Sequence, residues 1–233
     1  MEITVLILYG LALLLLFLYN CGQLSLIIIY LFSERKRRAA ILPIDNDSGT
    51  LPYVTIQLPV YNELYVVERL IDAVAQLHYP KHKLDIQVLD DSTDETVQII
   101  AAKIKDHQDW GLSIEHIRRP ERKGFKAGAL AYGLETAKGD LIAIFDADFV
   151  PEPDFLLKTV PHFHDPKVAI VQTRWEHLNE DFSLMTQLQA FGLNAHFTIE
   201  QSGRYAAGFL ANFNGTGGVW RKTAIADAGG WQS

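Results

Sequence analysis

The hydrophobic pattern divides the chain into three parts. An almost wholly apolar, uncharged stretch comes first and a short polar stretch follows. From residue 53 onward, short apolar runs alternate with segments whose apolar residues recur every three or four positions. The first pattern is typical of a transmembrane helix, the second of a linker and the third of a globular domain. We place these parts at residues 1–33, 34–52 and 53–233.

The N-terminal apolar stretch is long enough to cross a membrane. Ile3 to Phe32 contains no charged residue and exceeds the roughly 20 residues that a spanning helix needs. A cleaved signal peptide fits poorly, because Met1-Glu2 lacks a basic region and the apolar run is too long. The segment Glu34 to Arg38 is strongly basic, so the positive-inside rule places the following domain in the cytoplasm. We expect a membrane protein with one or more spans.

The globular part alternates strands with helices. Short apolar runs predict strands at residues 53–58, 84–89, 113–117, 141–145 and 168–173. Helical spacing predicts helices at 64–77, 96–105, 127–137, 155–163 and 182–201. This alternation forms right-handed βαβ units, which predict an α/β fold with a mostly parallel, Rossmann-like sheet. Ligands bind such sheets beyond the carboxyl ends of the strands.

Two carboxylates follow the fourth predicted strand. Asp146 and Asp148 come directly after the apolar run at 141–145, and side chains two apart on a strand point the same way. Paired hard carboxylates suit Mg²⁺ or Mn²⁺, which usually also take phosphate oxygens from a substrate. We interpret the pair as a metal–diphosphate site. The alternative is a polar loop that caps a helix.

Polar motifs also follow the other predicted strands. They are Tyr61 to Glu63, the pair Asp90-Asp91, and a basic loop that ends at Lys126. Because the carboxyl ends of parallel strands share one edge of a sheet, we expect these motifs to converge on one cleft. The aspartate pair suits hydrogen bonds to a base or a ribose, and equally suits a helix N-cap.

The basic loop has two interpretations. Lys126, together with Arg122 and Lys123, would bring positive charge to a departing diphosphate. The alternative is a solvated basic loop, which we prefer for Arg118 and Arg119.

A glycine-rich segment near the C-terminus is a further candidate. Asn214 to Gly218 would let the backbone approach a ligand closely, or would simply form a tight turn. Trp220 follows it. A tryptophan is more often a core residue, and the alternative is stacking on an acceptor sugar.

Taken in order, these motifs resemble those of the membrane-bound family 2 glycosyltransferases with the GT-A fold. Within that family the chain is most similar to the cellulose-synthase-like enzymes that make β-mannan or β-glucan backbones. The resemblance covers Val54 to Trp231. The stretches that carry it are Leu58 to Glu63, Leu89 to Asp94, Lys123 to Ala129, Phe145 to Asp148, Val171 to Trp175 and Phe213 to Arg221.

The resemblance implies roles for individual residues. Those implied to bind the nucleotide are Pro59, Tyr61, Glu63, Asp90, Asp91 and Lys126. Asp146 and Asp148 would form the family's D-x-D motif for Mg²⁺ or Mn²⁺, with Asp148 as a direct ligand. Those implied to lie near the acceptor sugar are Asn214, Gly215, Thr216 and Trp220. The implied reaction is inverting, with an acceptor hydroxyl attacking the anomeric carbon of a nucleotide sugar.

The resemblance is incomplete after Gly229-Gly230-Trp231. The family's Thr-Glu-Asp motif follows this segment and supplies the general base, whereas this chain reaches Ser233 two residues later. The family's Gln-x-x-Arg-Trp motif is also missing, and Gln172 to Trp175 is one residue too short to supply it. We therefore expect the N-terminal part of a longer enzyme or a truncated copy, inactive by itself.

Three functions are compatible with these patterns. The leading hypothesis is transfer of a hexose from a UDP- or GDP-linked donor to a growing β-linked polysaccharide at the cytoplasmic membrane face. The second is transfer to a lipid, a ceramide or diacylglycerol. The third, motivated by the missing base, is a non-catalytic nucleotide-sugar-binding membrane protein. The net charge of -7 argues against a nucleic-acid partner, because such proteins normally carry a basic face.

Overall fold

The structure, a computed structural model, describes residues 2–38, 51–210 and 213–232. The chain forms two compact units. The first joins Met1–Ile41 to Arg174–Asn212, and the second joins Leu42–Thr173 to Phe213–Ser233. Most of the predicted linker, residues 39–50, lies outside the described residues.

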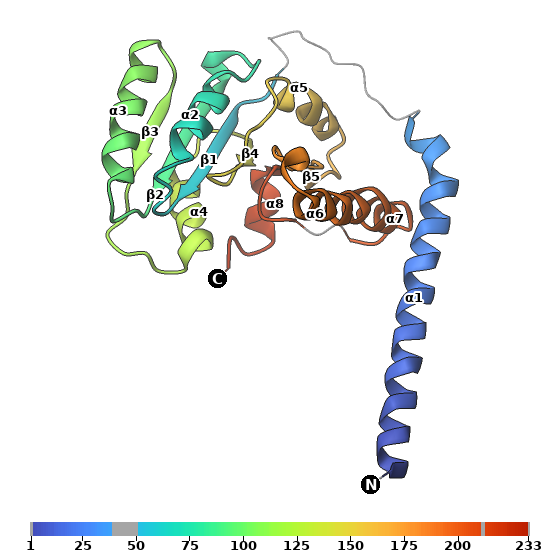
Figure 1. The fold of residues 1–233 in the computed structure, drawn as a ribbon. Helices are drawn as coiled ribbons and strands as arrows, with labels where there is room; N and C mark the ends of the chain where they lie inside the picture. Colours follow the sequence, from blue (N-terminus) through green and yellow to red (C-terminus); the bar gives the residue numbers. More distant parts are fainter. Residues whose placement is uncertain (1, 39–50, 211–212, 233) are drawn as a thin grey trace. The chain divides into compact units, whose positions relative to one another are not determined.

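A six-stranded sheet forms the centre of the second unit (Figure 1). Its strands are β1 (Val54–Val60), β2 (Leu84–Asp90), β3 (Ile114–Ile117), β4 (Leu141–Ile144), β5 (Ile170–Gln172) and β6 (Gly218–Arg221). They lie in the order β3-β2-β1-β4-β6-β5. The first four are parallel, and β6 runs antiparallel to both β4 and β5. The predicted α/β fold with a mostly parallel sheet is confirmed.

The strand β6 is absent from the predicted pattern. It is four residues long, and Gly218 at its start belongs to the predicted glycine-rich turn. It pairs with β4 and β5 in register, with Val219 opposite both Ala143 and Val171. Its position therefore depends on partners far away in the sequence rather than on a local pattern.

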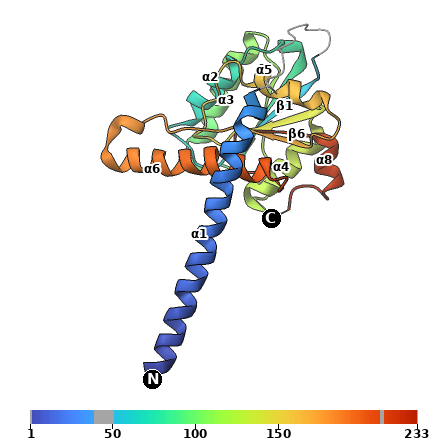
Figure 2. The same ribbon diagram turned by 90° about the vertical axis from the view of Figure 1, so that its right-hand side faces the viewer.

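Helices cover both faces of the sheet. One face packs against α2 (Val67–Ala75), α3 (Thr96–Asp109) and α5 (Phe155–Thr159), and the other against α4 (Phe125–Thr136) and α8 (Lys222–Asp227) (Figure 2). Alternation along β1 explains the first face, because Val54, Ile56 and Leu58 all point to the side of α2 and α3 and are fully buried. A 3₁₀ turn, Lys81–Lys83, leads into β2.

The predicted helix at 155–163 is split in two. The α-helix α5 ends at Thr159, and a 3₁₀ turn spans Val160–His164. The cause is Pro161, which has no backbone N–H to donate to the helix. Both parts still bury their apolar side chains against the sheet.

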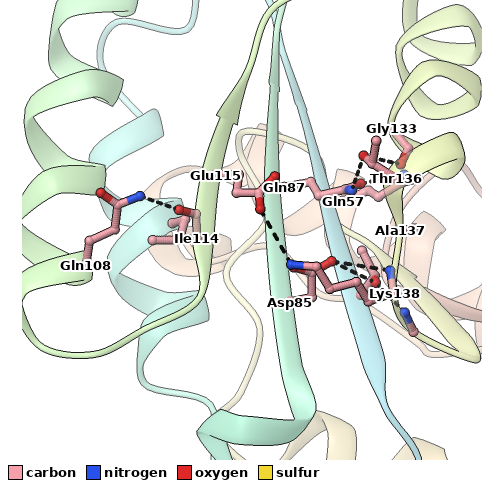
Figure 3. A network of polar contacts seen from close by, with 12 residues as sticks. Gln57, Asp85, Gln87, Gln108, Ile114, Glu115, Gly133, Thr136, Ala137 and Lys138 are labelled. Atoms are coloured by element: carbon pink, nitrogen blue, oxygen red, sulfur yellow. Dashed lines mark hydrogen bonds and ion pairs between the residues drawn. The ribbon is translucent and has the colours of Figure 1, made fainter.

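A layer of buried polar side chains lies between the sheet and α4 (Figure 3). Gln57 Nε2 donates to Gln87 Oε1 at 3.0 Å, and Gln87 Nε2 donates to Thr136 of α4 at 3.1 Å. Asp85 Oδ1 accepts from Lys138 Nζ at 3.0 Å. Gly133 makes this close packing possible, because a Cβ there would lie 2.6 to 2.9 Å from side-chain atoms of the two strands. This layer ties α4 to the strands whose ends carry the polar motifs.

The first unit is helical. Its helices are α1 (Glu2–Arg38), α6 (Leu184–Ala195) and α7 (Ser202–Ala206), with a 3₁₀ turn at Glu180–Phe182 and a π-helix at His196–Gln201. The predicted helix at 182–201 thus begins two residues later, at a capping box of Ser183 and Thr186. Among the described residues, α1 is the one helix long and apolar enough to cross a membrane. It packs against α7 at Gly203, where a Cβ would lie 2.7 Å from the Leu26 carbonyl oxygen.

Candidate active site

A cleft of about 310 Å³ lies where the parallel strands of the second unit end. Its lining comes from the segments that follow β1, β2 and β4 and from the loop and first turn of α4. The lining residues are Pro59, Val60, Tyr61, Glu63, Asp91, Arg122, Lys126, Ala129, Asp146, Ala147 and Asp148. The prediction that separate polar motifs converge on one cleft is therefore confirmed.

The loop after β4 holds the two carboxylates in place. The backbone N–H of Asp146 donates to the hydroxyl of Thr216 at 2.9 Å, and the N–H of Phe149 donates back to the Asp146 carbonyl at 3.0 Å. The ammonium group of Lys126 binds the Asp146 carboxylate and donates to the Gly215 carbonyl at 2.8 Å. Asp148 is exposed to solvent within the cleft.

This donor set fits a divalent cation that shares its coordination with a substrate. Asp146 and Asp148 supply hard carboxylate oxygens, which Mg²⁺ and Mn²⁺ prefer. No group of three or more His, Cys, Asp or Glu side chains in the described part of the chain could hold an ion by itself. Mg²⁺ is commonly bound by one or two carboxylates together with waters and substrate phosphates. The cleft thus has the donors for a metal–diphosphate site.

Glu63 adds a third negative charge to this end of the cleft. Burial raises the pKa of its carboxyl, and repulsion from Asp148 and Asp146 raises it further. A cation bound between the carboxylates would relieve that repulsion. The cleft is therefore electrostatically poised to take up positive charge.

We expect Glu63→Gln to stabilise the metal-free protein at neutral pH. A carboxyl whose pKa is raised by folding favours the folded state only while it is protonated. That contribution is complete below the ordinary value of 4.5 and is lost as the pH rises through the folded pKa. The urea concentration at the midpoint of unfolding, measured as the pH rises from below 4.5 to neutral, should therefore fall less for the variant than for the unmodified chain. Glu68→Gln, at an exposed glutamate of α2, is the control, and parallel curves for all three proteins would contradict the assignment.

The turn before α4 places Lys126 in the cleft. Gly124 and Phe125 both have positive φ, at 71° and 46°, so the chain turns sharply before the helix begins. Gly128 lies one turn further on, and a Cβ there would be 2.0 Å from the Lys123 carbonyl oxygen. The close approach keeps the loop against the helix. The first turn of α4 borders the cleft through Lys126 and Ala129, and the N-terminus of a helix favours an anion there.

Asp90 and Asp91 have different surroundings. Asp90 is buried and does not line the cleft: it accepts from the backbone N–H of Ser92, and His116 Nε2 lies 2.8 Å from its Oδ2. Burial by itself raises the pKa of Asp90, but the hydrogen bonds from His116 and Ser92 outweigh it and lower the pKa below its ordinary value. Asp91 does line the cleft.

Arg119 holds Asp91 with both arms of its guanidinium. Nε donates to Oδ1 at 2.7 Å and Nη2 donates to Oδ2 at 2.6 Å, and both side chains are more than nine-tenths buried. Its nitrogens also donate to the carbonyls of Lys123 and Phe125. The prediction that Arg119 is solvated is therefore wrong. Its sequence neighbourhood is basic and polar, and only the fold brings it to Asp91.

Arg122 lines the cleft and contacts two aromatic side chains, and its expected role toward a diphosphate stays a prediction. Its guanidinium carbon is 3.4 Å from the centre of the Tyr61 ring and 4.9 Å from that of Phe125. The contact of Nε with Asp91 is a loose one, at 3.9 Å. The structure thus places Arg122 with the aromatic side chains, while Lys126 is the cation beside the D-x-D carboxylates.

The chain matches a known protein family. Residues 55–225 match the family model described as Glycosyl transferase family 2. The chain belongs to this family. The GT-A-like arrangement, with a cleft at the carboxyl edge of a mostly parallel sheet, is the family fold, and the predicted resemblance is confirmed.

Two relatives of this glycosyltransferase chain carry the name glucomannan 4-beta-mannosyltransferase. A probable glucomannan 4-beta-mannosyltransferase 7 of Oryza sativa subsp. japonica is 48% identical over 189 residues, covering 79% of this chain and 32% of the relative. Glucomannan 4-beta-mannosyltransferase 9 of Arabidopsis thaliana is 40% identical over 215 residues, covering 88% and 40%. The chain therefore spans between about a third and two fifths of the length of these relatives.

A solved structure matches most of the glycosyltransferase chain. It is a mannosyltransferase from Pyrobaculum calidifontis in complex with GDP-Man and Mn²⁺, 27% identical with a TM-score of 0.65. The match covers 91% of this chain and 56% of that one.

In this family member, the glycine-rich segment 214–218 supports the loop that carries Asp146 and Asp148. Gly215 and Thr216 bind Lys126 and Asp146 as described, and the Asn214 N–H donates to Gln172 Oε1 at 3.1 Å. Gln172 Nε2 in turn donates to the Thr216 carbonyl at 3.0 Å. Gln172 is thus a supporting residue that its place in an incomplete motif did not reveal.

Trp220 is not among the residues that line the cleft. Its ring packs edge-on against Phe213 and Trp231, with ring centres 5.3 and 5.4 Å apart, in the cluster beside α8. This placement matches the core alternative for the residue. Its role toward an acceptor stays a prediction.

Proposed function

We propose that the native protein is a membrane-bound inverting mannosyltransferase. It would transfer a mannosyl group from GDP-mannose to a growing β-1,4-linked polysaccharide of the glucomannan class. The observation that carries this proposal is the cleft in which Lys126 faces Asp146 and Asp148 at the end of the parallel strands. The names of the relatives and the ligands of the Pyrobaculum enzyme support mannose, GDP and Mn²⁺ as the specific choices.

The chemistry to be supported is departure of a nucleoside diphosphate. Negative charge grows on the diphosphate as the bond to the sugar breaks, and groups that stabilise this charge speed the step. When bound, a divalent ion at Asp146 and Asp148 would supply Lewis-acid stabilisation of the leaving group. Lys126 would add a positive charge held in place by Gly215, and the first turn of α4 would contribute its N–H groups.

The nucleoside is assigned to the other end of the cleft. Tyr61 presents an aromatic face there, and Asp91 presents carboxylate oxygens that Arg119 holds in a fixed orientation. Lone pairs left on that carboxylate can accept from N–H groups of a base or hydroxyls of a ribose. Pro59 and Glu63 complete the proposed nucleotide pocket, and Asp90 supports it from beneath the surface.

The membrane assignment rests on α1 and on charge. The helix is long enough to span a bilayer, and the basic segment 34–38 follows its apolar part. We propose that the domain with the cleft is cytoplasmic, where it would meet soluble nucleotide sugars, and that the polysaccharide is extended at that membrane face.

Labelled donors test the proposal. Membranes from cells that express the native protein should incorporate radiolabel from GDP-mannose into ethanol-insoluble polymer that endo-β-1,4-mannanase releases. Membranes carrying the Asp148→Ala protein are the control. Label that is extracted into chloroform–methanol would favour transfer to a lipid instead, and incorporation from UDP-glucose alone would overturn the choice of donor.

A further inference from the structure

Arg122 occupies an unusual position in the cleft. Its guanidinium lies over the Tyr61 ring at 3.4 Å, which is the spacing of two stacked planar groups, and Phe125 lies beyond it at 4.9 Å. Tyr61 and Phe125 are themselves exposed, at 40% and 64%. Two exposed aromatic rings with a flat cation between them form a slot for flat groups.

The donors of Arg122 are uncommitted. Within the residues that the structure describes, its guanidinium makes no hydrogen bond, and its one ion pair is the 3.9 Å approach to Asp91. Arg119 already holds that carboxylate with two short hydrogen bonds. Arg122 can therefore move off Tyr61 without breaking a strong polar contact, in contrast to Arg119.

We infer that Arg122 is the movable wall of the nucleobase slot. This inference rests on the proposed function, in that a nucleotide must bind in this cleft. A base that stacks on Tyr61 occupies the position where the guanidinium of Arg122 now lies. Arg122 then moves outward and stacks on the opposite face of the base. Arginine stacks on bases as well as on aromatic side chains, so it exchanges one planar partner for another. The base is then held on both faces.

The arrangement favours large bases. A purine offers two fused rings to both walls of the slot, whereas a pyrimidine offers one, so the contribution of Arg122 should be larger for GDP than for UDP. Lys126, Asp146 and Asp148 are assigned to the diphosphate, which GDP and UDP share. These three residues therefore do not discriminate between bases. Arg122 is thus a specificity-determining residue for the donor nucleotide.

The test separates base from diphosphate. Binding of GDP, UDP and inorganic pyrophosphate to the chain in detergent with Mn²⁺ is measured by calorimetry. Arg122→Ala should weaken GDP binding about tenfold, as expected for loss of one stacking partner, and should leave pyrophosphate within about twofold. Arg122→Lys keeps the charge but lacks the plane, and should not restore GDP binding. Arg69→Ala, at an exposed arginine of α2 outside the cleft, should match the unmodified chain.

The possible outcomes are distinct. If Arg122→Ala lost equal affinity for GDP and pyrophosphate, or if Arg122→Lys fully restored GDP binding, Arg122 would act through its charge. Either result would overturn this inference and leave the proposed function standing. Tighter GDP binding by Arg122→Ala would also overturn it, because Arg122 would then only block Tyr61. Absence of binding of any nucleoside diphosphate by the unmodified chain would overturn both this inference and the proposed function.

Discussion

Asp148→Ala is expected to weaken Mn²⁺-dependent binding of GDP by at least about a hundredfold. In the proposed site, Asp146 and Asp148 are the two carboxylates that would bind the ion, so removal of one would take away half of its fixed negative ligands. Loss of even an outer partner of a metal ligand typically costs roughly 10–100-fold in affinity, and a direct ligand should cost at least the upper value. Titration with GDP at fixed Mn²⁺, repeated without metal, measures the effect.

Asp154→Ala is the matched control for this prediction. Asp154 lies six residues further along the chain, precedes α5 and forms an exposed ion pair with Lys158 at 2.7 Å. It does not line the cleft, so its removal should leave nucleotide binding within about twofold, as for ordinary surface substitutions. Equal losses in the two variants would contradict the assignment of Asp148 to the metal. A loss in Asp148→Ala that persists without Mn²⁺ would contradict it as well.

Asp146→Ala should behave differently from Asp148→Ala. It removes one of the two proposed metal ligands and at the same time releases Lys126 from its ion pair. Lys126 keeps its hydrogen bond to the Gly215 carbonyl, so its ammonium stays beside the diphosphate position. We therefore expect some metal-independent GDP binding in this variant that Asp148→Ala does not show, because one anionic competitor for the lysine is gone.

Five of the six strands and the location of the cleft were predictable from local sequence. Buried parallel strands are continuous apolar runs, and β4 at Leu141–Ile144 is fully buried as its composition predicts. The polar motifs follow β1, β2 and β4 directly, and the basic loop follows β3. Chain direction in a parallel sheet then brings the motifs to one edge, with no knowledge of side-chain contacts.

The partners of individual side chains were not predictable in the same way. Arg119 and Arg122 stand in one basic loop, yet one is buried against Asp91 and the other stacks on Tyr61. Local composition cannot distinguish the two arginines. Their different surroundings depend on contacts with residues 28 and about sixty positions away. The strand β6 escaped prediction for the same reason, since four residues carry little local signal and its pairing is entirely long-range.

Arg119→Ala is expected to destabilise the chain by about 3 kcal/mol. It breaks a buried ion pair and leaves Asp91 charged in a site where its side chain is only 7% exposed, and such a loss typically costs about 3–5 kcal/mol. The lower figure applies because Arg122 lies 3.9 Å away and offsets part of the charge. For a unit of this size the thermal midpoint should fall by roughly 6–12 °C, as measured by melting the chain in detergent.

A double-mutant cycle shows whether the pair itself carries that energy. Arg119→Ala combined with Asp91→Ala should cost less than the sum of the two single changes, because the double variant leaves no unpaired buried charge. Arg118→Ala is the control: its side chain is 50% exposed, and its loss should cost about 1 kcal/mol or less. Similar midpoints for the Arg118 and Arg119 variants would contradict a buried role for Arg119.

Because Arg119 also binds the carbonyls of Lys123 and Phe125, its removal should in addition loosen the turn that places Lys126. GDP affinity should then fall in Arg119→Ala even at temperatures where the variant remains folded.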